Sequence, residues 1–163
     1  MLTLVVGVGN PWRGDDAAGL EVAARVRAQA QDVIVATLEG DASALVHLWA
    51  GHDDVALVDA ASSGAPPGTL HELHAGDGTL PAGALRSSTH AFGVADAVGL
   101  ATVLCRLPAR LEIYAIEGED FSLGARLTPA VARTVDALAT RLLESRLTDA
   151  DMCRTTDVLR PVL

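Results

Sequence analysis

The sequence predicts an α/β fold in which a mostly parallel sheet is covered by helices on both faces. Two observations lead to this prediction. Apolar runs of strand length alternate along the chain with segments of helical period, and the first run is apolar almost throughout. Continuous apolar runs are typical of strands buried on both faces. Strands that alternate with helices form βαβ units, so their sheet is parallel.

The elements in the first half of the chain follow from their residues. LTLVVGV (2–8) is rich in β-branched residues and ends at glycine, which predicts a fully buried strand. Asp15 or Asp16 is suited to cap the helix that follows through GLEVAARVRAQA (19–30). We assign the cap to Asp15 and a functional role to Asp16. The alternation continues with a strand at DVIVATL (32–38), a helix at ASALVHLWA (42–50) and a strand at DVALVDA (54–60).

The second half of the chain adds an edge strand and a long final helix. SSGAPPGT (62–69) is rich in Gly and Pro and predicts a loop. TLHELH (69–74) alternates apolar and polar residues, as a half-exposed edge strand does. Pro129 fits the first turn of a helix from Thr128 to Ser145. The other elements are a helix at 92–105 and a strand at 110–116. We therefore expect one α/β domain over residues 1–147 and a polar C-terminal tail over 148–163.

Composition narrows the functional classes. A chain of 163 residues, half of them apolar, is long enough to form one sizeable hydrophobic core. The net charge of −9 argues against binding to nucleic acid or an anionic membrane, because both favour Lys and Arg. Cys105 and Cys153 lie far apart and indicate neither a disulfide framework nor a cysteine-based zinc site. The N-terminal apolar run is too short for a signal peptide or membrane span, so we expect a cytoplasmic protein. No long exposed apolar stripe demands a second subunit, so we expect a monomer.

Three polar residues follow or end predicted strands, where ligands bind in open α/β sheets. Asp16 lies between the first strand and its helix, Asp59 lies at the end of VALVD, and His90 precedes the helix at 92–105. Two carboxylates and an imidazole at one sheet edge are suited to bind a divalent metal. Each residue also has a structural alternative. Asp16 is suited to cap a helix, Asp59 to cap a turn through Ser62 or Ser63, and the ring of His90 to bond to backbone.

Other motifs are weaker or absent. GVGN lacks the third glycine of a dinucleotide fingerprint, because Trp12 stands at that position, and Pro11 interrupts the helix start. Gly-Lys-Ser/Thr does not follow it, which excludes a P-loop. Glu39, at the end of the second strand, is a secondary candidate for contact with substrate or site. We expect structural roles for the remaining histidines, which are His47, His52, His71 and His74.

The ordered motifs resemble one family. G-V-G-N-x-x-x-x-D-D-x-x-G at Gly7–Gly19, V-D-A at Val58–Ala60 and S-T-H-x-x-G at Ser88–Gly93 occur in the order found in the hydrogenase maturation endopeptidases, the processing proteases of nickel–iron hydrogenases. IEGEDFSLGARLTPAV (116–131) resembles the late strand, loop and final helix of that family. The chain departs from the family pattern at Glu39–Ala42, where E-G-D-A replaces D-G-G-T, and at Gly118, where many members have proline.

The resemblance implies a fold, an activity and a set of site residues. It implies a three-layer sandwich with a twisted five-stranded sheet, and removal of a C-terminal peptide from the hydrogenase large-subunit precursor after nickel insertion. The family's metal contacts carry over to Asp16, Asp59 and His90, and the metal is nickel already held by the precursor. A non-catalytic metal-binding or chaperone module for hydrogenase assembly is the main alternative. A small-molecule hydrolase that uses the same edge carboxylates is a third possibility.

Overall fold

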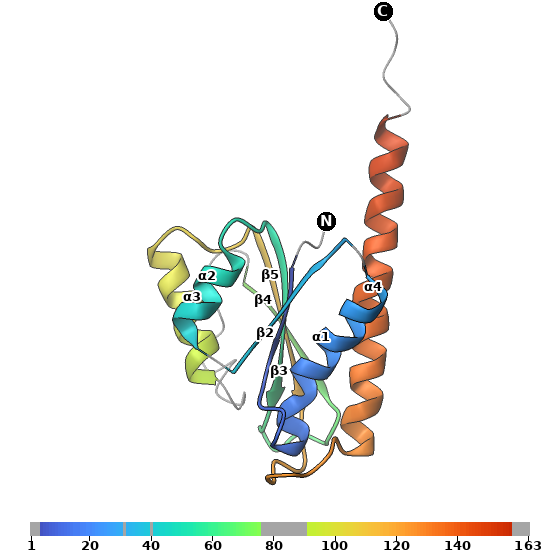
Figure 1. The fold of residues 1–163 in the computed structure, drawn as a ribbon. Helices are drawn as coiled ribbons and strands as arrows, with labels where there is room; N and C mark the ends of the chain where they lie inside the picture. The colour runs from blue at the N-terminus through green and yellow to red at the C-terminus, as the bar shows by residue number, and fades with distance from the viewer. Residues whose placement is uncertain (1–3, 31, 40, 76–90, 158–163) are drawn as a thin grey trace, which may run out of the picture.

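The computed structural model describes residues 4–30, 32–39, 41–75 and 91–157. Its centre is a five-stranded sheet with the strand order β2-β1-β3-β5-β4 (Figure 1). β1, β2, β3 and β5 are parallel, and β4 pairs with β5 in the antiparallel direction. This confirms the mostly parallel sheet and the edge position of the fourth strand. The strands are β1 (Leu4–Val8), β2 (Ile34–Leu38), β3 (Asp54–Ala61), β4 (Leu70–His74) and β5 (Arg110–Glu117).

Helices cover both faces of the sheet and complete the three layers that we predicted. α1 and α4 pack together on one face, and α2 and α3 pack together on the other (Figure 1). A short 3-10 helix, η1 (Gly14–Ala17), joins the loop after β1 to α1. The α-helices are α1 (Ala18–Gln29), α2 (Ala42–Trp49), α3 (Ala91–Val103) and α4 (Pro129–Asp157).

The alternation of side chains along the strands divides the core into two halves. On β3, Val55 and Leu57 pack in the core under α2 and α3, whereas Ala56 and Val58 pack in the core under α1 and α4. Because successive side chains of a strand point to opposite faces, Asp59 continues the row of Val55 and Leu57. β5 is in register with β3, with Ala61 opposite Glu117, so Glu117 lies on the same face as Asp59.

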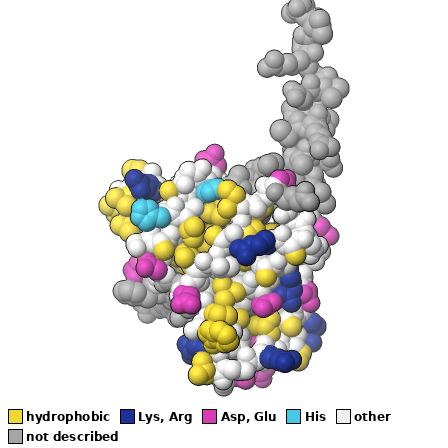
Figure 2. Space-filling model, viewed as in Figure 1, with side chains coloured by type: hydrophobic (Ala, Val, Ile, Leu, Met, Phe, Trp, Pro, Cys, Tyr) yellow, Lys and Arg dark blue, Asp and Glu magenta, His cyan; other side chains and the backbone are white. Residues whose placement is uncertain are grey.

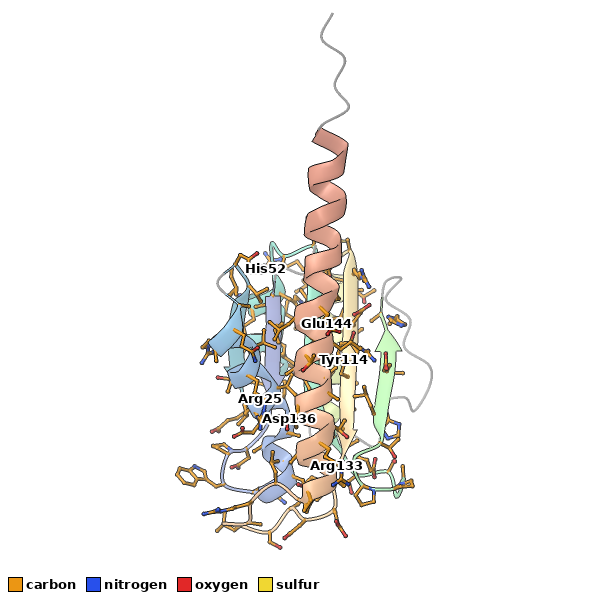
Figure 3. All side chains as sticks on the ribbon, turned by 90° about the vertical axis from the view of Figure 1, so that its right-hand side faces the viewer. Arg25, His52, Tyr114, Arg133, Asp136 and Glu144 are labelled. Atoms are coloured by element: carbon orange, nitrogen blue, oxygen red, sulfur yellow. The ribbon has the colours of Figure 1, made fainter. Side chains whose placement is uncertain are left out.

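Side-chain pairs attach α4 to its neighbours on the other face. The Nε of Arg25 on α1 lies 2.7 Å from Oδ1 of Asp136 on α4, and Figure 3 shows the two residues beside each other. Arg141 makes two bonds to the Glu72 carboxylate on β4, at 2.7 and 2.6 Å. Its guanidinium also lies 5.1 Å from the centre of the Tyr114 ring. α4 is therefore held against both α1 and the antiparallel edge of the sheet.

Two predicted boundaries were wrong. In the described part of the chain, the residue before α1 is Ala17, whose side chain makes no capping bond, so neither Asp15 nor Asp16 caps this helix. Both acids lie within the 3-10 turn η1, which ends at Ala17, directly before the first residue of α1. α4 continues to Asp157, whereas we predicted an end at Ser145, and the proposed start of the tail falls inside this helix. Residues 146–157 contain no Gly or Pro, so no strong helix breaker ends α4 earlier.

Glycines allow α1 to approach the ends of β1 and β3 closely. A Cβ added to Gly19 would lie 2.2 Å from the carbonyl oxygen of Val58 and 2.4 Å from that of Val8. A Cβ on Gly7 would lie 2.3 Å from the carbonyl oxygen of Gly19. These neighbours are backbone atoms, which cannot rotate away. The beginning of α1 is therefore held against the sheet edge by contacts that only glycine permits.

We predict that Gly19→Ala lowers the free energy of unfolding by about 1–3 kcal/mol, because the added methyl group overpacks against backbone. Urea unfolding followed by circular dichroism measures this change. Gly99→Ala on α3 is the control, since no described atom lies within 4 Å of its added Cβ and alanine favours the helix. Equal stability of the Gly19→Ala variant and the wild type would contradict the close approach.

Candidate functional site

The carboxyl ends of the four parallel strands form the edge where the candidate residues gather. This edge is the lower end of the sheet in Figure 1. α1 begins there, after η1. α3 begins at this edge as well. It runs to the opposite edge of the sheet, from which β5 starts at Arg110. Asp16, Glu39, Asp59 and Glu117 all belong to this edge, as the positions of their strands require.

Asp16 is held in η1 by its backbone. Its N–H donates to the carbonyl oxygen of Arg13 at 3.0 Å, and its own carbonyl accepts from the N–H of Asn10 at 3.3 Å. Gly9 allows this return of the chain, because a Cβ at that position would lie 2.1 Å from the carbonyl oxygen of Asp16. Asp16 is 1 % exposed, and η1 contacts β3. The structure therefore places this carboxyl group next to the end of the central strand.

Asp59 lies on β3 itself, two residues before the strand ends at Ala61. It is 1 % exposed, and its Oδ1 accepts the N–H of Ala60 at 2.8 Å. The N–H and hydroxyl of Ser63 donate to Glu117, so Ser63 is held by that carboxylate, and a cap by Asp59 through Ser62 stays a prediction. Asp16 and Asp59 thus reach one sheet edge as two buried carboxyl groups from separate segments, as the metal-site prediction required.

Asp15 has a different role from the predicted helix cap. Its buried carboxylate accepts the N–H groups of Glu119, at 2.8 Å, and Asp120, at 3.0 Å. It also accepts the N–H of Thr128 at 2.7 Å and the Thr128 hydroxyl at 2.9 Å. The Asp15 N–H donates to the Asp120 carbonyl at 2.9 Å. Asp15 therefore holds the loop between β5 and α4 against η1, beside Asp16.

Glu117, at the end of β5, lies on the same edge as the candidate site, but we did not select it from the sequence. Its buried carboxylate accepts from the N–H of Ser63 at 2.6 Å, the Ser63 hydroxyl at 2.8 Å and the N–H of Gly64 at 2.9 Å, and lies 3.1 Å from Nε2 of His71. Burial by itself raises the pKa of Glu117, but the hydrogen bonds from Ser63, His71 and Gly64 outweigh it and lower the pKa below its ordinary value. The sequence signal for this residue was its position directly after the predicted strand at 110–116.

Glu39 lies beside a groove at the β2 side of the edge. The groove has a volume of about 410 Å³ and is lined by Gly9, Pro11, Leu20, Thr37, Leu38 and Glu39. Glu39 is exposed, as a residue that contacts substrate must be. Asp41, close to Glu39 in the sequence, has a structural role. It caps α2 by accepting the N–H groups of Ser43, at 2.8 Å, and Ala44, at 3.1 Å.

His90, the third predicted metal contact, lies outside the described residues. α3 starts at the next residue, Ala91, on the edge that carries Asp16 and Asp59. Among the described residues, no three His, Cys, Asp or Glu side chains form a group suited to hold a metal ion. The structure thus brings two of the three predicted residues to one edge, and the complete metal site stays a prediction.

A family comparison identifies the class of protein. The profile of HycI, described as hydrogenase maturation protease, matches residues 21–145. The chain belongs to the hydrogenase maturation protease family. The matched region includes Asp59 and His90 and begins after Asp16. No curated protein sequence shows a significant match to the chain.

Solved structures agree with the family. The hydrogenase maturating endopeptidase HybD from E. coli superposes with a TM-score of 0.74 at 25 % identity, covering 91 % of this chain and 94 % of HybD. An endopeptidase from Escherichia coli gives 0.76 at 25 % identity, with 88 % and 91 % covered. The HybD protease from Thermococcus kodakarensis shares the fold, with a TM-score of 0.67, 23 % identity and coverage of 89 % and 98 %. The predicted fold and the assignment as a hydrogenase maturation endopeptidase are therefore confirmed.

No helix in the described part of the chain is both long enough and apolar enough to span a membrane. The cytoplasmic location itself stays a prediction.

We predict that Asp15→Ala lowers the free energy of unfolding by about 2–4 kcal/mol, because buried N–H groups of the β5–α4 loop lose their shared acceptor. Urea unfolding measures the loss, and hydrogen exchange at Glu119, Asp120 and Thr128 reports whether it is local. Asp53→Ala removes an exposed carboxylate and is the control, with unchanged stability and exchange. Unchanged exchange at those three amides in Asp15→Ala would contradict the anchoring role.

We predict that Glu117→Gln reduces the loss of stability in acid. Because the folded pKa of Glu117 lies below its ordinary value of 4.5, its carboxylate stabilises the fold above pH 4.5, and this contribution is lost as the pH falls through the folded pKa. The free energy of unfolding, measured by urea titration at several pH values from 7 to about 3, should fall less steeply in the variant. Glu119→Gln, at an exposed position, is the control with the wild-type slope. Identical slopes in Glu117→Gln and wild type would show that the hydrogen bonds do not favour the ionised form.

Proposed function

We propose that the protein removes the C-terminal extension of a nickel-loaded hydrogenase large-subunit precursor and recognises the precursor through its nickel. The observation that carries this proposal is the pair of buried carboxyl groups, Asp16 and Asp59, at the carboxyl edge of the sheet in a member of this protease family. We assign His90 as the third contact to the metal. The nickel arrives with the precursor and is part of the substrate.

The chemistry of the side chains supports this role. Two carboxylates and one imidazole are oxygen and nitrogen donors that leave coordination positions for ligands from a second protein. A bound divalent ion polarises a nearby carbonyl group. In our proposal Asp16 or Asp59 takes the proton of the water that attacks the scissile carbonyl, and the reaction leaves a new carboxylate and a new amine. Glu39, at the rim of the apolar groove, contacts the substrate peptide.

Three Ala substitutions test the site. Asp16→Ala, Asp59→Ala and His90→Ala should each reduce processing of the nickel-loaded precursor at least about 100-fold, because each removes a group from the metal contacts or the proton transfer. Mass spectrometry of the released peptide measures the rate, and circular dichroism checks folding. Asp53→Ala, Cys105→Ser and Cys153→Ser are the controls that retain processing.

The results separate the proposed function from its alternatives. Wild-type rates in all three Ala variants would exclude the assigned site, and loss of processing in either Cys variant would indicate a thiol mechanism. Binding of the precursor without cleavage by the wild type would indicate the non-catalytic assembly role. Turnover of a short ester or peptide without the precursor would indicate a small-molecule hydrolase.

A further inference from the structure

Two large hydrophobic side chains are exposed at the edge that carries the candidate site. Trp12, after β1, is 70 % exposed, and Leu123, in the loop between β5 and α4, is 83 % exposed. Figure 2 shows hydrophobic side chains among basic and acidic ones at this lower end of the molecule. Exposed apolar side chains that gather at one place mark interaction sites more often than isolated ones do. We call these two residues the Trp12–Leu123 surface.

A backbone hydrogen bond joins the two loops that carry these side chains. The N–H of Gly124 donates to the carbonyl oxygen of Trp12 at 2.7 Å, which joins the two loops directly. The Trp12 N–H donates to Oδ1 of Asn10 at 2.9 Å, and Asp15 holds the loop of Leu123 from the other side. A large apolar side chain on a fixed loop loses little conformational freedom when it is covered, and such residues are typical anchors of protein interfaces.

We infer that the Trp12–Leu123 surface binds an apolar segment of the precursor protein while the precursor presents its C-terminal extension to Asp16 and Asp59. This inference rests on the proposed function and adds to it a docking surface outside the metal contacts. The partner chemistry is a protein segment with at least one aliphatic or aromatic side chain that covers the indole of Trp12 and the isobutyl group of Leu123.

Continuity with the candidate site identifies the occupant. Trp12 precedes Asp16 by four positions in the segment between β1 and α1, and Asp15 bonds directly to the loop of Leu123. Pro11, the residue before Trp12, also lines the apolar groove beside Leu38. A second copy of the chain on this surface would cover the site. The net charge of −9 disfavours an anionic membrane as the occupant.

Binding and kinetics of the full-length protein with the nickel-loaded precursor test this inference. Trp12→Ala/Leu123→Ala should raise the Kd, measured by biolayer interferometry, and the KM for processing at least tenfold, with kcat within twofold of wild type. Val103→Ala/Leu104→Ala is the matched control and should leave all three values unchanged, because Val103 is 81 % exposed at the opposite end of α3. Circular dichroism verifies that both variants are folded, as expected for exposed positions.

Four outcomes separate the inference from the proposed function. Weaker binding and a higher KM in the Trp12/Leu123 variant alone support both. Normal binding and processing by that variant overturn the docking surface and leave the function intact. If the Trp12/Leu123 variant binds the precursor more weakly than the wild type does, but the wild type does not cleave the precursor, the docking surface is supported and the protease function is overturned. Failure of the wild type both to bind and to cleave the precursor overturns both.

Discussion

The carboxylate of Asp15 joins two segments that lie more than a hundred residues apart in the sequence, and the geometry of the functional edge depends on this contact. It accepts N–H groups from both ends of the β5–α4 loop, so that loop closes around η1. Hydrogen bonds to an ionised acceptor are roughly twice as strong as those between neutral groups, which suits a contact that must order a loop. Asp16, the next residue, is thereby positioned together with the loop.

Acidic side chains hold several of the described loops at this edge; Asp15 and Glu117 are buried, whereas Asp41 is exposed. Glu117 holds the turn after β3 through Ser63 and Gly64, and Asp41 caps α2 after β2. Each carboxylate satisfies backbone donors that would otherwise lack partners where the chain leaves a strand or enters a helix. The edge therefore contains two classes of acid: those that fold the loops, and the pair Asp16 and Asp59 that we assign to the chemistry. Residue type alone does not distinguish the two classes.

Close backbone packing completes the arrangement. Gly7 and Gly19 let α1 start directly on the carbonyl groups of β1 and β3, which places η1 over the end of the central strand. Trp12, in the segment before η1, lies outside this packing, and its indole is exposed. This explains how one short segment carries a buried acid and an exposed indole only four residues apart.

The sequence by itself determined the order and type of the elements, the mostly parallel sheet and the family. Hydrophobic period is a local property, so runs such as LTLVVGV and the alternation in TLHELH predict their structure without knowledge of the rest of the chain. Asp16 and Asp59 were also accessible to sequence reasoning, because the carboxyl ends of parallel strands meet at one edge.

Only the tertiary structure decided the role of Asp15, the function of Glu117 as a loop anchor and the contact between the loops that carry Trp12 and Leu123. The partners of Asp15 lie in a loop after the last strand, so the local pattern of an acid before a helix predicted a cap that does not form. The predicted α4 was too short for a different reason. Its last residues are polar, but they include no Gly or Pro that would end the helix. Contacts between segments distant in sequence depend on how the elements pack, and packing is not encoded in any single window of residues.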